Sequence, residues 1–298
     1  MFLNISNPVP LLVVRESSLG SNVYATYQIF LARLRTYSRY KGQVIMSVLM
    51  PIMIASLPIL MGTGLGGANA VRNFQTNTKI TSGSFQGYLL IGALLMQLTS
   101  NTLWNFGFWL RREQTTGTLE SGVYLVPTSK PWMLLGSSAY VLVRNSASFI
   151  LALILGVIIF SIQANEFLNT TLILGVFFLL LGLPSLIGLS LLFGSLILKF
   201  KETGTLINLI EFAISFLMGV FYPITVMPWG LQIIASLFPP TWTTNEIRSA
   251  LYDVPYFLSV WGDIVVSLGF ALIVPILAFS VFIAVERRIL RHEGVGQF

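Results

Sequence analysis

The chain has 298 residues, of which 55% are hydrophobic and only 9% are charged, and its formal net charge is +6 at pH 7. A typical soluble domain is about 25% charged, so this chain lacks the charged side chains needed to cover a water-soluble surface. It contains no cysteine, which excludes disulfides, thiolate metal sites and a cysteine nucleophile. The charges stand in short clusters between apolar runs, a pattern unlike a nucleic-acid-binding face. We therefore expect an all-α, polytopic membrane protein.

The first 42 residues are expected to form a cytoplasmic segment with an amphipathic helix over residues 22–41. Apolar side chains repeat there at spacings of four and three, at Val23, Tyr27, Phe30, Leu34 and Tyr37. This spacing places them on one helical face, whereas Arg35 and Arg39 fall on the other. The pattern predicts an interfacial helix on the inner leaflet. The alternative is that it extends the first span.

Six apolar stretches then come near the ~20 residues that a helix needs to cross ~30 Å of hydrocarbon. They are 43–62, 85–110, 132–162, 170–198, 205–222 and 257–285. They predict a six-span domain over 43–285 and a basic tail over 286–298. Lys and Arg concentrate in the segments that this order places on one side. Because such residues accumulate in cytoplasmic loops, we expect a plasma-membrane protein with both termini in the cytoplasm.

Catalytic, cofactor and metal sites are not expected in this chain. The sequence GTGLGG at 62–67 fits a dinucleotide-binding pattern, but it follows an apolar helix instead of a strand. We expect a flexible exit from the first span there, leading into a polar outer loop. A Walker A sequence is lacking, the only histidine is His292, and the carboxylates are scattered. These features do not favour an enzyme.

The segment between the second and third stretches has the features of a short helix. Gly117 provides a turn, Thr118 a plausible N-cap, and Glu120 an acid in the first turn, where the helix dipole favours it. The helix should end before Pro127. With Leu119, Val123 and Tyr124 beside Glu113 and Glu120, it could dock a soluble partner; the alternative is a solvated loop.

Two charged residues fall inside apolar stretches, Arg144 in the third and Glu211 in the fifth. Charges within a membrane are costly and therefore mark structural pairs or transport paths. We expect either an ion pair between them or a polar part of a path.

Residues 222–251 are apolar but are interrupted by Pro223, Pro228, Pro239 and Pro240. They are too broken for a straight span and too apolar for an ordinary loop. A short re-entrant helical hairpin on the outer side accounts for both properties.

Two of these segments resemble the type-2 ABC export permeases, the transmembrane subunits of ATP-driven exporters. The run from Glu113 through Gly117, Thr118 and Leu119 to Glu120, followed by Pro127, resembles their cytoplasmic signature. The hairpin resembles their outer hairpin through Pro223, Pro228, Pro239, Glu246 and Arg248.

The resemblance implies a permease subunit that moves its substrate outward by alternating access. Two permease copies, identical or different, would form the path, and separate ATPase subunits would hold ATP and Mg²⁺. The helix from Gly117 to Leu125 would couple the ATPase subunits to the permease spans. The aromatic-rich spans suit an amphiphile such as a drug, antibiotic or lipid. A lipid-linked polysaccharide exporter and a gradient-driven carrier without an ATPase are the alternatives.

Overall fold

A computed structural model describes residues 18–80, 83–107, 130–168, 170–200 and 203–292. All regular structure in these residues is helical, which confirms the all-α fold. The helices are α1 (Leu19–Arg39), α2 (Lys41–Leu60), α3 (Gly67–Thr78), α4 (Phe85–Gly107), α6 (Lys130–Ile159), α7 (Leu172–Phe200), α8 (Thr203–Leu217), α9 (Trp229–Ser236), α10 (Pro239–Tyr252) and α11 (Val260–His292).

Four of the described helical segments are long and apolar enough to cross a membrane: Lys41–Leu65, Gly136–Ile159, Leu172–Ser195 and Val260–Val285. They confirm a polytopic membrane protein. The other two expected spans also fall on helices, but α4 carries many polar side chains, and the apolar helix found among the fully described residues of α8, Asn208–Leu217, is shorter than a span. The count of six spans therefore stays a prediction.

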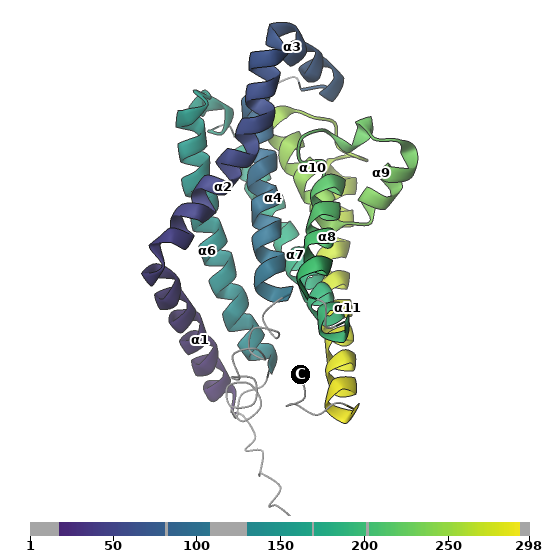
Figure 1. Cartoon of the computed structure of the whole chain (residues 1–298). Coiled ribbons are helices and arrows are strands. Elements are labelled where there is room, and N and C mark those ends of the chain that lie inside the picture. The colour runs from purple at the N-terminus through teal and green to yellow at the C-terminus, as the bar shows by residue number, and fades with distance from the viewer. Residues whose placement is uncertain (1–17, 81–82, 108–129, 169, 201–202, 293–298) are drawn as a thin grey trace, which may run out of the picture.

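The long helices run beside one another and alternate in direction (Figure 1). The short helices α3, α9 and α10 lie toward one end of the bundle, and α1 lies at the other. Helix α4 occupies the centre, where it contacts α2, α6, α7, α8 and α10. Its residues Tyr88, Leu89, Leu90 and Leu94 are almost completely buried. The outer faces of α2, α6, α7 and α11 expose large apolar side chains, as expected of surfaces that face lipid.

Helices α7 and α11 touch at the level of their backbones. A Cβ atom added at Gly188 would lie 2.7 Å from the backbone nitrogen of Pro275 and 2.8 Å from its Cα. Only a residue without a side chain permits this approach, which is the use that membrane helices make of small residues. The crossing fixes the distance between the two helices.

Helix α1 is amphipathic, as expected. Phe30, Leu34 and Tyr37 pack against Tyr140 and Val141 of α6. The side chains of Arg35 and Arg39 are exposed, and so are Val23 and Tyr27 of the expected apolar face, at 49% and 56%. The position of α1 at a membrane surface stays a prediction.

The prediction of a polar outer loop after the first span is wrong. A π-helical turn, Met61–Leu65, continues α2, and the chain then turns at Gly67, whose φ is +62°, into helix α3. Phe74 of α3 packs edge-on against Phe85 and Tyr88, with ring centres 4.9 and 5.7 Å apart. Phe74, which anchors α3, stands among polar residues in the sequence, so the segment taken by itself resembles a loop.

Candidate functional site

The proline-rich segment forms two short helices. Pro228 precedes α9, and Pro239 and Pro240 occupy the first turn of α10, where proline is tolerated because those N–H groups have no helical partner. Pro223 precedes a 3-10 turn, Ile224–Val226. Helix α10 is buried along nearly its whole length, between α4, α7 and α11. The expected helical hairpin is thus present, with its second helix inside the bundle.

Arg248 links α10 to the end of α8. Its side chain is 2% exposed. Its Nη1 donates to the carbonyl oxygen of Gly219 at 2.6 Å, and its Nη2 donates to that of Val220. Gly219 has φ +65° and directly follows the last turn of α8. Because this end of a helix carries partial negative charge, a buried guanidinium is well placed to neutralise it.

Glu246 lies two residues earlier on α10 and is completely buried. One carboxyl oxygen accepts a hydrogen bond from the Ser267 hydroxyl of α11. The other oxygen has no hydrogen-bond partner in the described structure. Glu246 therefore joins α10 to α11 through one hydroxyl. Arg248 joins α10 to the end of α8 and, through a bond of 3.4 Å from Nη2 to the Tyr88 carbonyl oxygen, to α4. The two charged residues of the hairpin serve different contacts.

The half of α4 that runs toward the α1 end of the bundle carries a band of polar side chains: Gln97, Thr99, Ser100, Asn101, Thr102, Trp104 and Asn105. We call it the α4 polar band. Asn145 of α6 donates to the Thr102 hydroxyl at 3.1 Å, and Gln97 donates to Asn101 at 3.0 Å. We expected residues 85–110 to form one apolar span, and that range includes the α4 polar band. The polar composition of the band was the sequence signal that could have identified it.

Glu211 of α8 is bound by the α4 polar band. The Ser100 hydroxyl donates to Oε1, and the Trp104 indole N–H donates to Oε2 at 2.6 Å. Both carboxyl oxygens thus accept hydrogen bonds from one neighbouring helix. Charge-assisted bonds of this kind are about twice as strong as neutral ones, so Glu211 fixes α8 against α4.

Arg144 has different partners. Its guanidinium carbon lies 5.3 Å from the centre of the Tyr37 ring of α1 and 6.0 Å from that of Tyr140. Its Nη2 donates to Asn145 at 3.3 Å. The expected ion pair between Arg144 and Glu211 is not seen among the described contacts, because the two side chains lie on different sides of the α4 polar band.

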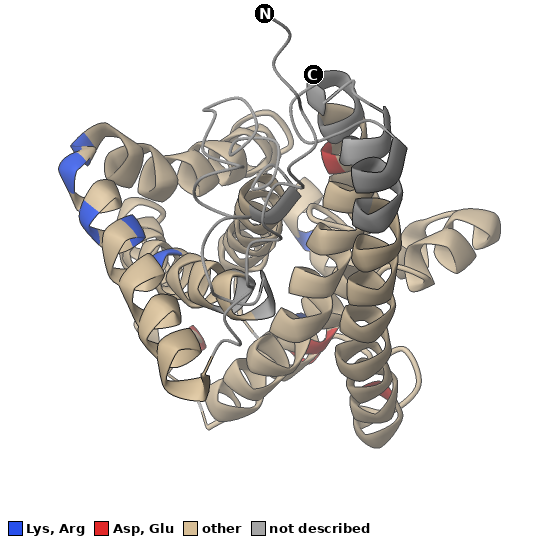
Figure 2. Cartoon of the chain, turned by 90° about the horizontal axis from the view of Figure 1, so that it is seen from below, with Lys and Arg blue, Asp and Glu red and all other residues tan. Residues whose placement is uncertain are grey.

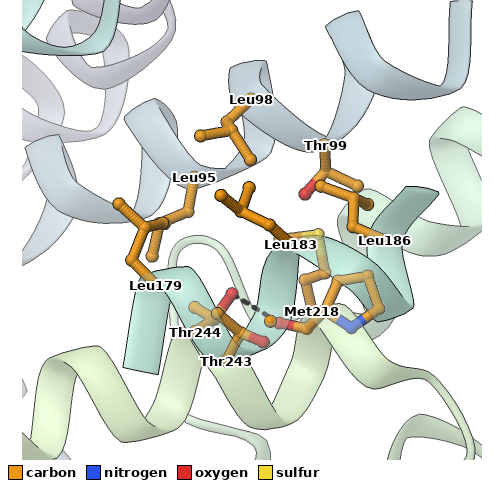
Figure 3. Close-up of a pocket in the computed structure, with 11 residues that line it drawn as sticks. Leu95, Leu98, Thr99, Leu179, Leu183, Leu186, Met218, Thr243 and Thr244 are labelled. Carbon is orange, nitrogen blue, oxygen red and sulfur yellow. Dashed lines mark hydrogen bonds between the residues drawn. The ribbon is translucent and has the colours of Figure 1, made fainter. Parts of the chain in front are cut away.

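Two small cavities adjoin α4. One, of about 20 Å³, lies between α4, α7 and α10 and is lined by leucines together with Thr99, Thr243 and Thr244 (Figure 3). The other, of about 10 Å³, is more polar and includes Ser47, Asn101 and Asn145. Each has room for a water molecule and is far too small for an amphiphilic substrate.

The expected coupling residues lie outside the described residues, at Glu113, Gly117, Thr118, Leu119, Glu120, Val123 and Tyr124. The structure therefore places none of them. Within the described part of the chain, no three His, Asp or Glu side chains gather in a way that could hold a metal ion.

Comparison with known proteins identifies the family. The sequence model described as ABC-2 type transporter matches residues 23–252, well over half of the chain's 298 residues. No curated protein matches the sequence. The match begins in α1 and ends with α10, so it includes the α4 polar band and the whole hairpin. The chain therefore belongs to the ABC-2 type transporter family, as a membrane-embedded transport subunit.

Proposed function

We propose that this chain is the permease subunit of an ABC exporter that moves an amphiphilic substrate, such as a drug, an antibiotic or a lipid-like molecule, out of the cell. Family membership supports a transport subunit, and the resemblance of the segment around Gly117 supports export. The observation that carries the proposal is the α4 polar band, bound to Glu211 on one side and to Asn145 on the other. A purely structural bundle in lipid gains little from so many polar groups.

The proposed topology has six spans with both termini in the cytoplasm. The alternating directions of α2, α4, α6, α7, α8 and α11 support this order. It places the α1 end of the bundle inside and the hairpin end outside. The basic residues Arg39 and Lys41, at the junction of α1 and α2, then fall on the cytoplasmic side, in agreement with the positive-inside rule.

Alternating access would be driven by a separate ATPase subunit that binds ATP and Mg²⁺. The segment from Glu113 to Tyr124 would transmit the movement of the ATPase to α4 and α6, which flank this segment in the chain. Two permease copies would enclose the substrate between them. The buried contacts of Arg248 and Glu246 would hold the hairpin to the moving helices, so that the outer end moves as a unit.

Gentle purification of the tagged chain from its native membrane tests the proposal. We expect a soluble subunit with a Walker A sequence to co-purify, with ATPase activity in the eluate. Replacing Glu113 and Glu120 together by alanine should release that subunit, whereas Arg72→Ala, an exposed residue of α3 at the other end, should not. Transport by the chain alone, following an ion gradient with no ATPase attached, would overturn the proposal in favour of a secondary carrier.

A further inference from the structure

Arg144 is a cation inside a membrane-spanning segment. It lies within the candidate span Gly136–Ile159, in the middle of α6. Its Nε atom is buried and has no hydrogen-bond partner in the described structure. The contacts that it makes there are with two tyrosine rings and the neutral side chain of Asn145. No described carboxylate lies within ion-pairing distance of it.

The guanidinium of Arg144 contacts the last turns of α1. Tyr37, which the guanidinium contacts, lies three residues before Tyr40, where α1 ends and α2 begins. Tyr37 also shares a hydrogen bond of 3.0 Å with Ser47 of α2. A long arginine side chain can extend toward the polar surface while its stem stays among apolar groups. The guanidinium is therefore held beside the junction of the two helices.

That junction is basic. Arg39, Tyr40 and Lys41 are all exposed there. In the view from below, much of the Lys and Arg colouring lies along α1 and its junction with α2, on one side of the molecule (Figure 2). Positive charge at this level attracts anionic lipid headgroups. Arg144 is the half-buried member of this group, whereas Arg39 and Lys41 are exposed.

We propose that Arg144, together with the Arg39–Lys41 junction, binds the phosphate of an anionic phospholipid from the leaflet at the α1 end of the bundle. The planar guanidinium can bind two phosphate oxygens at once. Tyr37 and Tyr140 lie beside the guanidinium, and Nη2 also donates to Asn145, so its other N–H groups would bind the headgroup. The acyl chains would then lie along the exposed apolar side chains of α2 and α6, such as Met46 and Val143.

Binding of short-chain fluorescent phosphatidylglycerol to the purified, delipidated protein tests this site, with phosphatidylcholine as the neutral comparison. We expect a preference for phosphatidylglycerol, and Arg144→Gln should reduce its affinity by about tenfold or more. The matched control Arg72→Gln removes one exposed basic residue at the opposite end and should leave the affinity unchanged. Equal binding by wild type and Arg144→Gln, or no preference in wild type, would overturn the proposal.

Arg144→Lys keeps the experiment decisive if Arg144→Gln does not fold. Lysine retains the charge but cannot form the paired contact, so we expect several-fold weaker binding of phosphatidylglycerol and an unchanged affinity for phosphatidylcholine. An affinity for phosphatidylglycerol equal to that of wild type would contradict the proposed guanidinium contact.

The bound phosphate could belong to a resident lipid or to a transported one, and this distinction rests on the proposed exporter function. Vesicles with the protein, its ATPase partner and labelled phosphatidylglycerol separate the two sources. ATP-driven movement of the label, lost in Arg144→Gln, would place the site on the transport path. Binding without movement identifies a resident lipid. Because the binding assay uses no ATP, a failure of the exporter proposal would not alter its result.

Discussion

The guanidinium carbon of Arg248 lies 3.9 Å from the centre of the Tyr88 ring. This contact joins α10 to α4 at the place where Arg248 also binds the carbonyl groups that follow α8. A cation above an aromatic face is most favourable when water is excluded, as it is here. One side chain thus connects three helices at the hairpin end of the bundle.

Arg248→Ala should destabilise the protein strongly. The change leaves the carbonyl oxygens of Gly219 and Val220 without their charged donor, and such bonds contribute about 1.5–3 kcal/mol each. We expect a lower midpoint of thermal unfolding in detergent, with a smaller loss for Arg248→Lys, which keeps the charge. Arg72→Ala on exposed α3 is the control and should change little. Equal midpoints for the two alanine variants would contradict this role.

Gly92→Ala tests the close approach of α4 to the chain after α8. An added Cβ would overlap both Nη2 of Arg248 and the Val220 carbonyl oxygen. Overpacking of this kind costs about 1–3 kcal/mol. Gly269→Ala in α11, where an added Cβ meets nothing within 4 Å, is the matched control and should be neutral or slightly stabilising. Thermal unfolding of both variants compares them, and a stable Gly92→Ala variant would show that these backbones lie farther apart.

A double-mutant cycle can measure the bond between Trp104 and Glu211. We expect Trp104→Phe and Glu211→Ala to be coupled by about 1–2 kcal/mol in unfolding, because each removes the same charge-assisted bond. Arg144→Ala and Glu211→Ala should instead be additive within about 0.5 kcal/mol. Coupling between Arg144 and Glu211 without coupling between Trp104 and Glu211 would instead support an ion pair, which is not seen among the described contacts.

Glu246→Gln should preserve folding. The buried carboxyl group meets one hydroxyl, that of Ser267, and its second oxygen lacks a hydrogen-bond partner in the described structure. A neutral amide of the same shape can still accept that bond and removes the cost of burying a charge. Glu246→Ala, which deletes the acceptor and leaves a space, should lower the midpoint of thermal unfolding. A glutamine variant as unstable as the alanine variant would show that the carboxylate charge itself is needed.

Val123→Pro addresses the proposed coupling segment. Proline in a helix interior costs about 3 kcal/mol, so this variant should stop export while the chain stays in the membrane with its ATPase still active. ATP hydrolysis and export, measured on the same vesicles, report the two activities separately. Arg72→Ala, an exposed residue of α3 at the opposite end, is the control and should leave coupling intact. Full export by Val123→Pro would contradict the assignment.

Hydrophobic length and proline spacing were enough to predict most of the helices. Each apolar stretch became a helix, and Pro228 and Pro239 marked the starts of α9 and α10. These features are local, because a helix in lipid must satisfy its own backbone hydrogen bonds. Helix α3 was missed since its contact with the bundle depends on Phe74, whose partners Phe85 and Tyr88 belong to another helix.

The partners of the two charges inside apolar stretches could not be predicted. Sequence counting places Arg144 and Glu211 at similar depths, but it does not fix the rotation of α6 and α8 about their axes. In the structure that rotation brings Glu211 to Trp104 and Arg144 to Tyr37. Opposite charges at one depth are therefore weak grounds for predicting a pair when a polar helix such as α4 lies between them.

The contact of Gly188 with Pro275 has a consequence for movement. Where the two backbones meet so closely, the helices cannot slide along each other without first separating. Pro275 lacks the N–H that would bond to the preceding turn, so α11 can bend at the same level. Any rearrangement of α7 against α11 would then be a bend or a change of angle and not a sliding movement along the helix axes.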